Sequence, residues 1–157
     1  MKINSEDEKK LEELCAQAFD FARNNDKESL EILLNAGLNI NLSNHKGNTL
    51  LMLAAYNNSL DVARMLLQRG ADVDKKNDRL QTPLAGVCFK GYYEMAKLLV
   101  EAGANVDDNE SNLSPMNCAL MFRRKEILSL LLKHSKKKPT LIQRFFSKLM
   151  GVRGGFK

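Results

Sequence analysis

The chain lacks the features that mark secreted, membrane-spanning and zinc-binding proteins. Its 157 residues contain no tryptophan and three prolines, and its three cysteines, Cys15, Cys88 and Cys118, form no Cys-x-x-Cys pair. An odd, widely spaced set favours neither a disulfide framework nor a zinc site. No apolar run approaches the roughly 18 residues of a membrane span, and residues 1–8 have no apolar core for secretion. We therefore expect a cytoplasmic protein with reduced, buried thiols.

Charge is distributed unevenly along the chain. Residues 1–126 carry 16 basic and 19 acidic side chains, whereas residues 127–157 carry 8 basic and no acidic ones. The formal net charge of +5 therefore combines a mildly acidic body with a strongly basic C-terminal segment.

A period of 33 residues runs through the body of the chain. Gly37, Gly70 and Gly103 are spaced by this interval, and so are Thr49 and Thr82. A fixed period of this length is typical of repeat proteins, in which each unit stacks on its neighbours.

The recurring positions have physical reasons. Thr49 and Thr82 can each cap the start of a helix, since a threonine oxygen accepts a hydrogen bond from a first-turn N–H. Pro83 suits the first helical position, and the recurring glycines can end the second helix of each unit. A left-handed turn between the two helices is expected at Asn25, Asn58 and Gly91.

This unit of turn, helix, tight turn, helix and glycine stop resembles the ankyrin repeat. Gly47-Asn48-Thr49-Leu50-Leu51-Met52-Leu53-Ala54-Ala55 is similar to the family phrase Gly-x-Thr-Pro-Leu-His-x-Ala-Ala. The resemblance implies an all-α solenoid of four helix-turn-helix repeats, and we expect a C-terminal amphipathic helix after it. The expected parts are an ankyrin-repeat domain over 1–138, with repeats at about 8–41, 42–74, 75–107 and 108–138, and a basic helix and tail over 139–157.

Two columns depart from the family pattern. Met52, Ala85 and Asn117 occupy the column of the usual helix histidine, so the hairpin hydrogen bonds of that histidine must be replaced or lost. Leu80 stands where Gly47 supplies the usual hairpin glycine. If that backbone requires a positive φ, Leu80 is strained or the loop differs.

No catalytic constellation is visible. His45 and His134 belong to different repeats, no nucleophile column lies near either, and no glycine-rich phosphate loop follows a strand. Because ankyrin solenoids are binding scaffolds, we expect a non-enzymatic protein.

The expected binding surface is the concave face, formed by hairpin tips and the ends of the first helices. A stripe with an aromatic bias runs there, and exposed aromatic side chains often mark binding sites. Alternatively, the rings pack between helices and extend the core. The residues assigned to a partner-binding face are Arg23, Tyr56, Asn57, Phe89, Lys90, Met121 and Phe122.

Two phrases also resemble a small bacterial family of ankyrin-type catalase accessory proteins, which are associated with catalase and with supplying its haem. They are Asn77-Asp78-Arg79-Leu80-Gln81-Thr82-Pro83-Leu84-Ala85-Gly86, with Phe89-Lys90-Gly91 after it, and Met121-Phe122-Arg123. The resemblance implies a bacterial cytosolic protein that carries haem to catalase. Haem would be a carried ligand, and no cofactor would be required for folding.

Haem binding would draw on the aromatic stripe. A phenolate tyrosine can ligate haem iron, so Tyr56 is the expected ligand, with His45 or Tyr92 next, although Tyr56 also fits an ordinary contact residue. Cationic side chains at the rim can pair with the propionates. The candidate haem-binding residues are Tyr56, Phe89, His45, Lys46, Arg79 and Lys90.

The segment after Ser135, which replaces the terminal glycine of the fourth repeat, is basic and amphipathic. Apolar residues at 141, 142, 145, 146, 149 and 150 form one helical stripe. We expect this stripe to cap the fourth repeat; the alternative is that residues 139–150 bind an anionic membrane surface or an acidic partner groove. Nucleic acid is not an expected partner, since lysines confined to one tail provide no reading surface.

The functional expectation is therefore haem delivery to catalase by a non-enzymatic binding protein. The alternatives are a generic protein–protein interaction adaptor without a ligand and a peripheral membrane adaptor that binds through residues 139–150.

Overall fold

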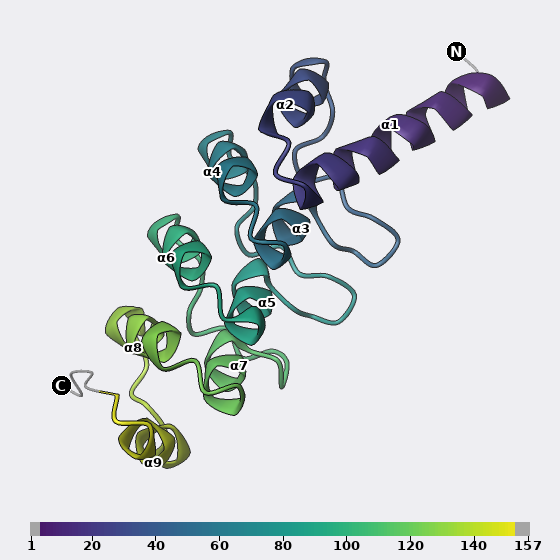
Figure 1. The fold of residues 1–157 in the computed structure, drawn as a ribbon. Helices are drawn as coiled ribbons and strands as arrows, with labels where there is room; N and C mark the ends of the chain where they lie inside the picture. Colours follow the sequence, from purple (N-terminus) through teal and green to yellow (C-terminus); the bar gives the residue numbers. More distant parts are fainter. Residues whose placement is uncertain (1–3, 153–157) are drawn as a thin grey trace. The chain divides into compact units, whose positions relative to one another are not determined.

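The computed structural model describes residues 4–152, and residues 153–157 of the expected tail lie outside that range. The described residues form nine helices and no regular strand, which confirms the expected all-α class; Ser43 and Thr49 form an isolated bridge. The helices are α1 (Ser5–Arg23), α2 (Lys27–Asn35), α3 (Leu50–Tyr56), α4 (Leu60–Gln68), α5 (Pro83–Lys90), α6 (Tyr93–Glu101), α7 (Pro115–Met121), α8 (Lys125–His134) and α9 (Leu141–Leu149) (Figure 1).

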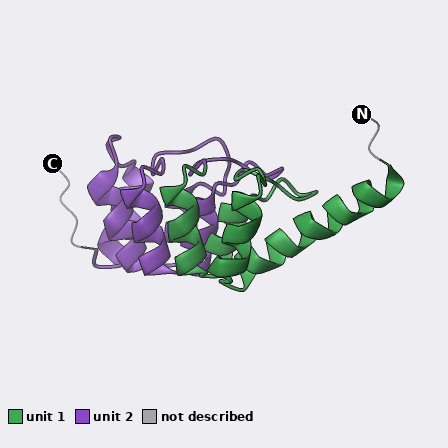
Figure 2. Cartoon of the chain, turned by 90° about the horizontal axis from the view of Figure 1, so that it is seen from above, with its two compact units in different colours: residues 1–71 green, residues 72–157 purple. Residues whose placement is uncertain are grey.

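The chain forms two compact units, unit 1 over residues 1–71 and unit 2 over residues 72–157 (Figure 2). In unit 1, α1 packs against α3 and α2 packs against α4. In unit 2, α5 packs against α7 and α6 against α8, while α9 packs against α7. Within each unit the first helices of the helix pairs thus pack together, and so do the second helices. The repeat boundaries within 1–138 stay a prediction.

The predicted helix starts are confirmed. The Thr49 hydroxyl accepts a hydrogen bond from the N–H of Met52 at 3.1 Å, and the Thr82 hydroxyl accepts one from Ala85 at 3.2 Å. Pro83 occupies the first turn of α5. Each threonine accepts a hydrogen bond from an N–H that has no partner inside its own helix. This local requirement explains why threonine recurs at that position of the repeat.

The predicted turns and helix stops also form as expected. Asn25 and Asn58 have φ values of 57°, and Gly91 has 87°. Gly37 ends α2 with paired bonds, from its own N–H to the C=O of Leu34 and from the next N–H to the C=O of Leu33. This is the Schellman geometry, which favours a glycine.

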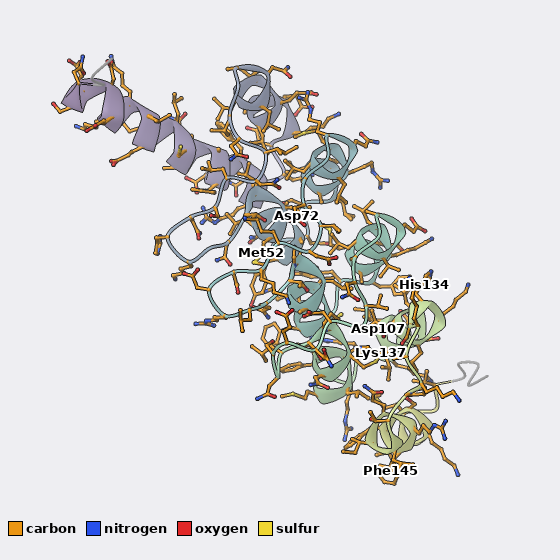
Figure 3. All side chains as sticks on the ribbon, turned by 180° about the vertical axis from the view of Figure 1, so that it is seen from behind. Met52, Asp72, Asp107, His134, Lys137 and Phe145 are labelled. Atoms are coloured by element: carbon orange, nitrogen blue, oxygen red, sulfur yellow. The ribbon has the colours of Figure 1, made fainter. Side chains whose placement is uncertain are left out.

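Large apolar side chains that lie one 33-residue period apart form part of the core. Leu66 and Leu99 are fully buried, as are the thiols of Cys88 and Cys118. In the histidine column, Met52 (Figure 3) and Ala85 are buried. Asn117 is exposed there, and its Nδ2 donates to the C=O of Asn112 at 3.3 Å. At Asn117, therefore, an asparagine side chain makes a hydrogen bond to the hairpin in place of the usual histidine.

The last helix forms where predicted, and its predicted packing on the fourth repeat is confirmed by its contact with α7. The expectation that the apolar stripe makes this contact is wrong. Leu141, Phe145 and Leu149 remain exposed, whereas Ser147 on the opposite face is fully buried. The helix is therefore held on unit 2 through its polar face, and the stripe does not cap the fourth repeat. No helix within residues 4–152 has the length and apolarity needed to cross a bilayer.

Candidate partner-binding surface

An exposed apolar patch forms where α5 and α7 end in unit 2. We define the apolar patch as Phe89, Met121 and Phe122, each of which is exposed. The rings of Phe89 and Phe122 meet edge to face, with centroids 4.6 Å apart and an interplanar angle of 81°. This geometry is favourable for an aromatic pair, and both rings remain partly exposed to solvent.

A hydrogen bond between helix pairs fixes the backbone beneath the apolar patch. Arg124 Nη2 donates to the C=O of Phe89 at 2.9 Å. The guanidinium also covers Gly91, because a Cβ built on Gly91 would lie 2.7 Å from Arg124 Cζ. Unit 1 makes the corresponding bond with a different side chain, from Ser59 Oγ to the C=O of Arg23 at 2.9 Å. The backbone at the end of α1 in unit 1 and of α5 in unit 2 is thus held in place by a side-chain hydrogen bond.

The hairpins of unit 2 are ordered by polar contacts. Lys76 Nζ lies 2.8 Å from Asp108 Oδ1 and 2.6 Å from Glu110 Oε2. The hydrogen bond from Lys76 to Asp108, followed by the one to Glu110, raises the pKa of the lysine. The Asn77 side chain accepts the N–H groups of Arg79 and Gln81 at 3.0 and 3.1 Å. The Arg79 side chain is exposed on this ordered loop.

Unit 1 holds the remaining sequence-predicted site residues. Tyr56 and Asn57 are exposed at the end of α3, and His45 and Lys46 are exposed in the preceding hairpin. Arg23 is half-buried at the end of α1, where its guanidinium forms an ion pair with Asp20 at 2.7 Å. These side chains are accessible to a partner, and the role of each stays a prediction.

The predicted haem site draws on both units. Tyr56 belongs to unit 1, whereas Phe89, Arg79 and the half-buried Lys90 belong to unit 2. Within unit 2, Phe89 and Phe122 are nearly perpendicular rather than coplanar, so a porphyrin could stack on one of these rings but not on both.

Sequence reasoning missed an anchoring site at Asp107. Its carboxylate accepts the Ser135 hydroxyl and, at 2.8 Å, the N–H of Lys136, while Lys137 Nζ donates to its C=O at 3.2 Å (Figure 3). The 33-residue period could have revealed this site. Asp74 occupies the same column, and its carboxylate accepts the N–H of Asn105 at 3.0 Å. A carboxylate in this column therefore accepts a hydrogen bond from a backbone N–H near the end of the next repeat.

Side chains that could ligate a metal or act as nucleophiles are dispersed through the part of the chain that the structure describes. No three His, Cys, Asp or Glu residues of residues 4–152 gather in the manner of a metal site. The half-buried Cys15 lies in unit 1, whereas the buried Cys88 and Cys118 lie in unit 2. Exposed apolar side chains and ordered hairpins are consequently the features of this chain that suit a binding function.

Comparison with known proteins identifies the repeat. A family model for ankyrin repeats in three copies matches residues 16–77 and 70–142. An ankyrin repeat protein of Pseudomonas aeruginosa, PA3287, is 52% identical over 46 residues, which is 29% of this chain. The match spans 27% of the length of that relative. Because the family model covers most of the chain, and its repeats explain the caps, turns and stops described above, the chain belongs to the ankyrin-repeat family.

Proposed function

We propose that this chain is a non-enzymatic binding module whose protein partner docks on the apolar patch of unit 2. Ankyrin repeats indicate a protein–protein interaction role, since stacked repeats create extended binding surfaces. The observation that carries the proposal is the exposed edge-to-face pair of Phe89 and Phe122, beside the exposed Met121. Aromatic side chains at the centre of an interface often contribute most of its binding energy.

In its finer form, the proposal is that the partner is a bacterial catalase and that the cargo is haem. Two features support it: the resemblance of the third and fourth repeats to catalase accessory proteins, and the exposed phenol of Tyr56 at the end of α3. A phenolate can bind haem iron, and the exposed cation Lys46, in the same unit as Tyr56, suits a propionate. An exposed surface suits a carrier that must release its cargo.

Direct titration tests whether catalase is the partner and whether it binds the apolar patch. Purified catalase without haem is titrated with the wild-type chain and with a Phe122→Ser variant in a calorimeter. Loss of a central aromatic contact is expected to weaken binding by at least about 30-fold, the equivalent of about 2 kcal/mol. Ile32→Ser is the control, because Ile32 is also a large exposed apolar residue, with an exposed fraction of 68% against 38% for Phe122, but lies on α2. Equal losses in both variants, or binding unaffected by Phe122→Ser, would contradict the assigned surface.

Haem titration tests the finer form separately. Wild-type protein is expected to develop a saturable Soret band, and Tyr56→Phe, which keeps the ring and removes the oxygen, is expected to shift and weaken it. A wild-type spectrum in the Tyr56→Phe variant would direct attention to His45 or Tyr92. Absence of saturable binding in the wild type would leave the protein-binding module without a haem cargo.

A further inference from the structure

The last helix leaves an apolar face open. We define the exposed stripe as Leu141, Ile142, Phe145, Phe146 and Leu149, whose exposed fractions are 83%, 68%, 64%, 41% and 66%. Phe145 and Phe146 meet edge to face, with ring centroids 5.7 Å apart. Five neighbouring large apolar side chains on one short helix form a contiguous surface that is unusual for a soluble protein unless it binds something.

The opposite face of α9 holds the helix on unit 2. Ser147 is fully buried and Gln143 is half-buried. Gln143 lines a cavity together with Met116 of α7 and Leu132 of α8. Small and polar residues therefore face the body of unit 2, and the exposed stripe points away from it. Phe145 projects away from α8 in Figure 3.

Anchors on both sides of α9 fix this orientation. Before the helix, Asp107 binds the hydroxyl of Ser135 and the N–H of Lys136. After it, Val152 is buried and lines a cavity with Tyr93 of α6 and Lys125 of α8. At the start of the helix, Thr140 and Gln143 form a reciprocal capping box. The orientation of the stripe is thus set by the fold on either side of the helix.

Positive charge borders the stripe. Arg144 and Lys148 are exposed one helical turn apart, beside the face of Leu141, and three consecutive lysines at 136–138 precede the helix. Residues 127–157 contain no acidic residue at all. An apolar helical face flanked by cations is the arrangement that binds the boundary between headgroups and acyl chains of an anionic bilayer.

We propose that α9 docks this protein on an anionic lipid surface, with its axis in the membrane plane and the exposed stripe inserted among the acyl chains. At about 1.5 Å per residue the helix is only about 14 Å long, which suits lying on a bilayer and not spanning it. A second copy of the chain is a poorer occupant, because the basic residues beside the two stripes would repel one another.

A fluorescent reporter tests the proposal directly, because the chain contains no tryptophan. Phe145→Trp places a single indole in the stripe. Vesicles of equal parts phosphatidylglycerol and phosphatidylcholine are expected to shift its emission to the blue, and vesicles of phosphatidylcholine alone are not. Phe122→Trp, which places the indole in the apolar patch, is the control and is expected to show no shift.

Variants separate the apolar and electrostatic parts in a vesicle flotation assay. Combined Phe145→Ser and Leu149→Ser are expected to abolish measurable flotation. Combined Arg144→Gln and Lys148→Gln are expected to weaken binding roughly 30-fold, because each cation near an anionic surface contributes about 1 kcal/mol. All four residues are exposed, so circular dichroism melts should match the wild type. Ile32→Ser on α2 should leave flotation unchanged.

Three outcomes would overturn the proposal. One is the absence of a blue shift and of flotation with anionic vesicles while the protein remains monomeric. Another is a dimer in size-exclusion light scattering that dissociates on Phe145→Ser, which would assign the stripe to a second copy. The third is equal affinity for neutral and anionic vesicles, which would remove the charge complementarity on which the choice of partner depends.

Discussion

At the scale of single residues, Leu80 has a backbone conformation that its side chain disfavours. Its φ is 58°, whereas Gly47 fills the equivalent hairpin position with a φ of 72°. A residue with a Cβ is destabilised by roughly 1–2 kcal/mol in the left-handed region, and a glycine avoids this strain. Glycine in turn costs about 0.5–1 kcal/mol, because its unfolded chain has more conformational entropy to lose. Leu80→Gly is therefore expected to raise the free energy of unfolding by about 0.5–1 kcal/mol, measured by urea denaturation.

The control for this prediction is Leu80→Ala, which shortens the side chain but keeps the Cβ and hence the strain. It is expected to give no stabilisation. Should Leu80→Ala stabilise as much as Leu80→Gly, removal of an exposed apolar side chain would explain both results, and the backbone argument would be wrong.

Buried thiols make the stability of unit 2 sensitive to alkaline pH. Burial raises the pKa of both Cys88 and Cys118 above the ordinary value of 9.0. In the unfolded chain these thiols ionise near pH 9, whereas in the folded chain they stay protonated to higher pH. Their contribution to stability is therefore complete below pH 9 and is lost as pH rises through the folded pKa values.

This pH dependence is measured as the free energy of unfolding between pH 7 and pH 10.5. Lysines and tyrosines also titrate there, so the informative quantity is the difference between the wild type and Cys88→Ala. The variant is expected to lose less stability on going to high pH. Parallel curves for the two proteins would show that Cys88 does not contribute.

Residue-scale features were predictable wherever the backbone itself repeats. The caps at Thr49 and Thr82 and the left-handed turns at Asn25 and Asn58 depend on local geometry, which the 33-residue period exposes. Arg123 escaped prediction, although its φ is 53°. Arginine is not a residue that left-handed turns favour. The fourth repeat is one residue shorter, so Arg123 lies 32 residues after Gly91, and its position in the repeat requires the turn although its side chain gives no signal.

At the scale of elements, α9 shows where periodicity stops being informative. The spacing of apolar residues predicts a helix and its stripe, and both are present. The same spacing favoured burial of the stripe, yet Ser147 is the buried residue. Which face of a helix packs depends on the surface that receives it and on anchors outside the helix, such as Asp107 and Val152. A hydrophobic period carries no information about those contacts.

The Asp107 anchor gives an element-scale prediction. Asp107→Ala removes the acceptor of the Ser135 hydroxyl and of the Lys136 N–H, and each hydrogen bond to a charged group contributes roughly 1.5–3 kcal/mol. Amide hydrogen exchange in α9 is expected to accelerate, because the helix loses its attachment at one end. Exchange in α3 and α4 of unit 1 should stay at its wild-type rate.

Asp107→Asn is the matched control, since the amide retains one oxygen acceptor of similar size. Its α9 exchange rates are expected to lie between those of wild type and Asp107→Ala. If Asp107→Ala leaves α9 exchange unchanged, the burial of Ser147 and Val152 alone is sufficient to hold the helix.

At the scale of the whole molecule, each unit has its own buried leucine column. Leu66→Ala in unit 1 and Leu99→Ala in unit 2 remove fully buried side chains, and such changes cost roughly 2–5 kcal/mol each. The denaturant midpoint for unfolding of the unit that carries the substitution is therefore expected to fall in each variant. Two neutral variants would contradict the assignment of these columns to the core.

Deletion of residues 139–157 distinguishes a capping helix from an outward-facing one. A helix that capped the repeats with its apolar stripe would, when deleted, uncover apolar surface and increase binding of an apolar dye such as ANS. In the structure the stripe is already exposed, while Ser147 and Val152 are buried. The deletion is therefore expected to lower the melting temperature by a few degrees through loss of these contacts, and to decrease dye binding.

The full-length Phe145→Ser and Leu149→Ser variant should lose dye binding without the change in melting temperature. Stronger dye fluorescence after deletion would show that the stripe covers the repeats in solution, and the membrane-docking proposal would fall with it.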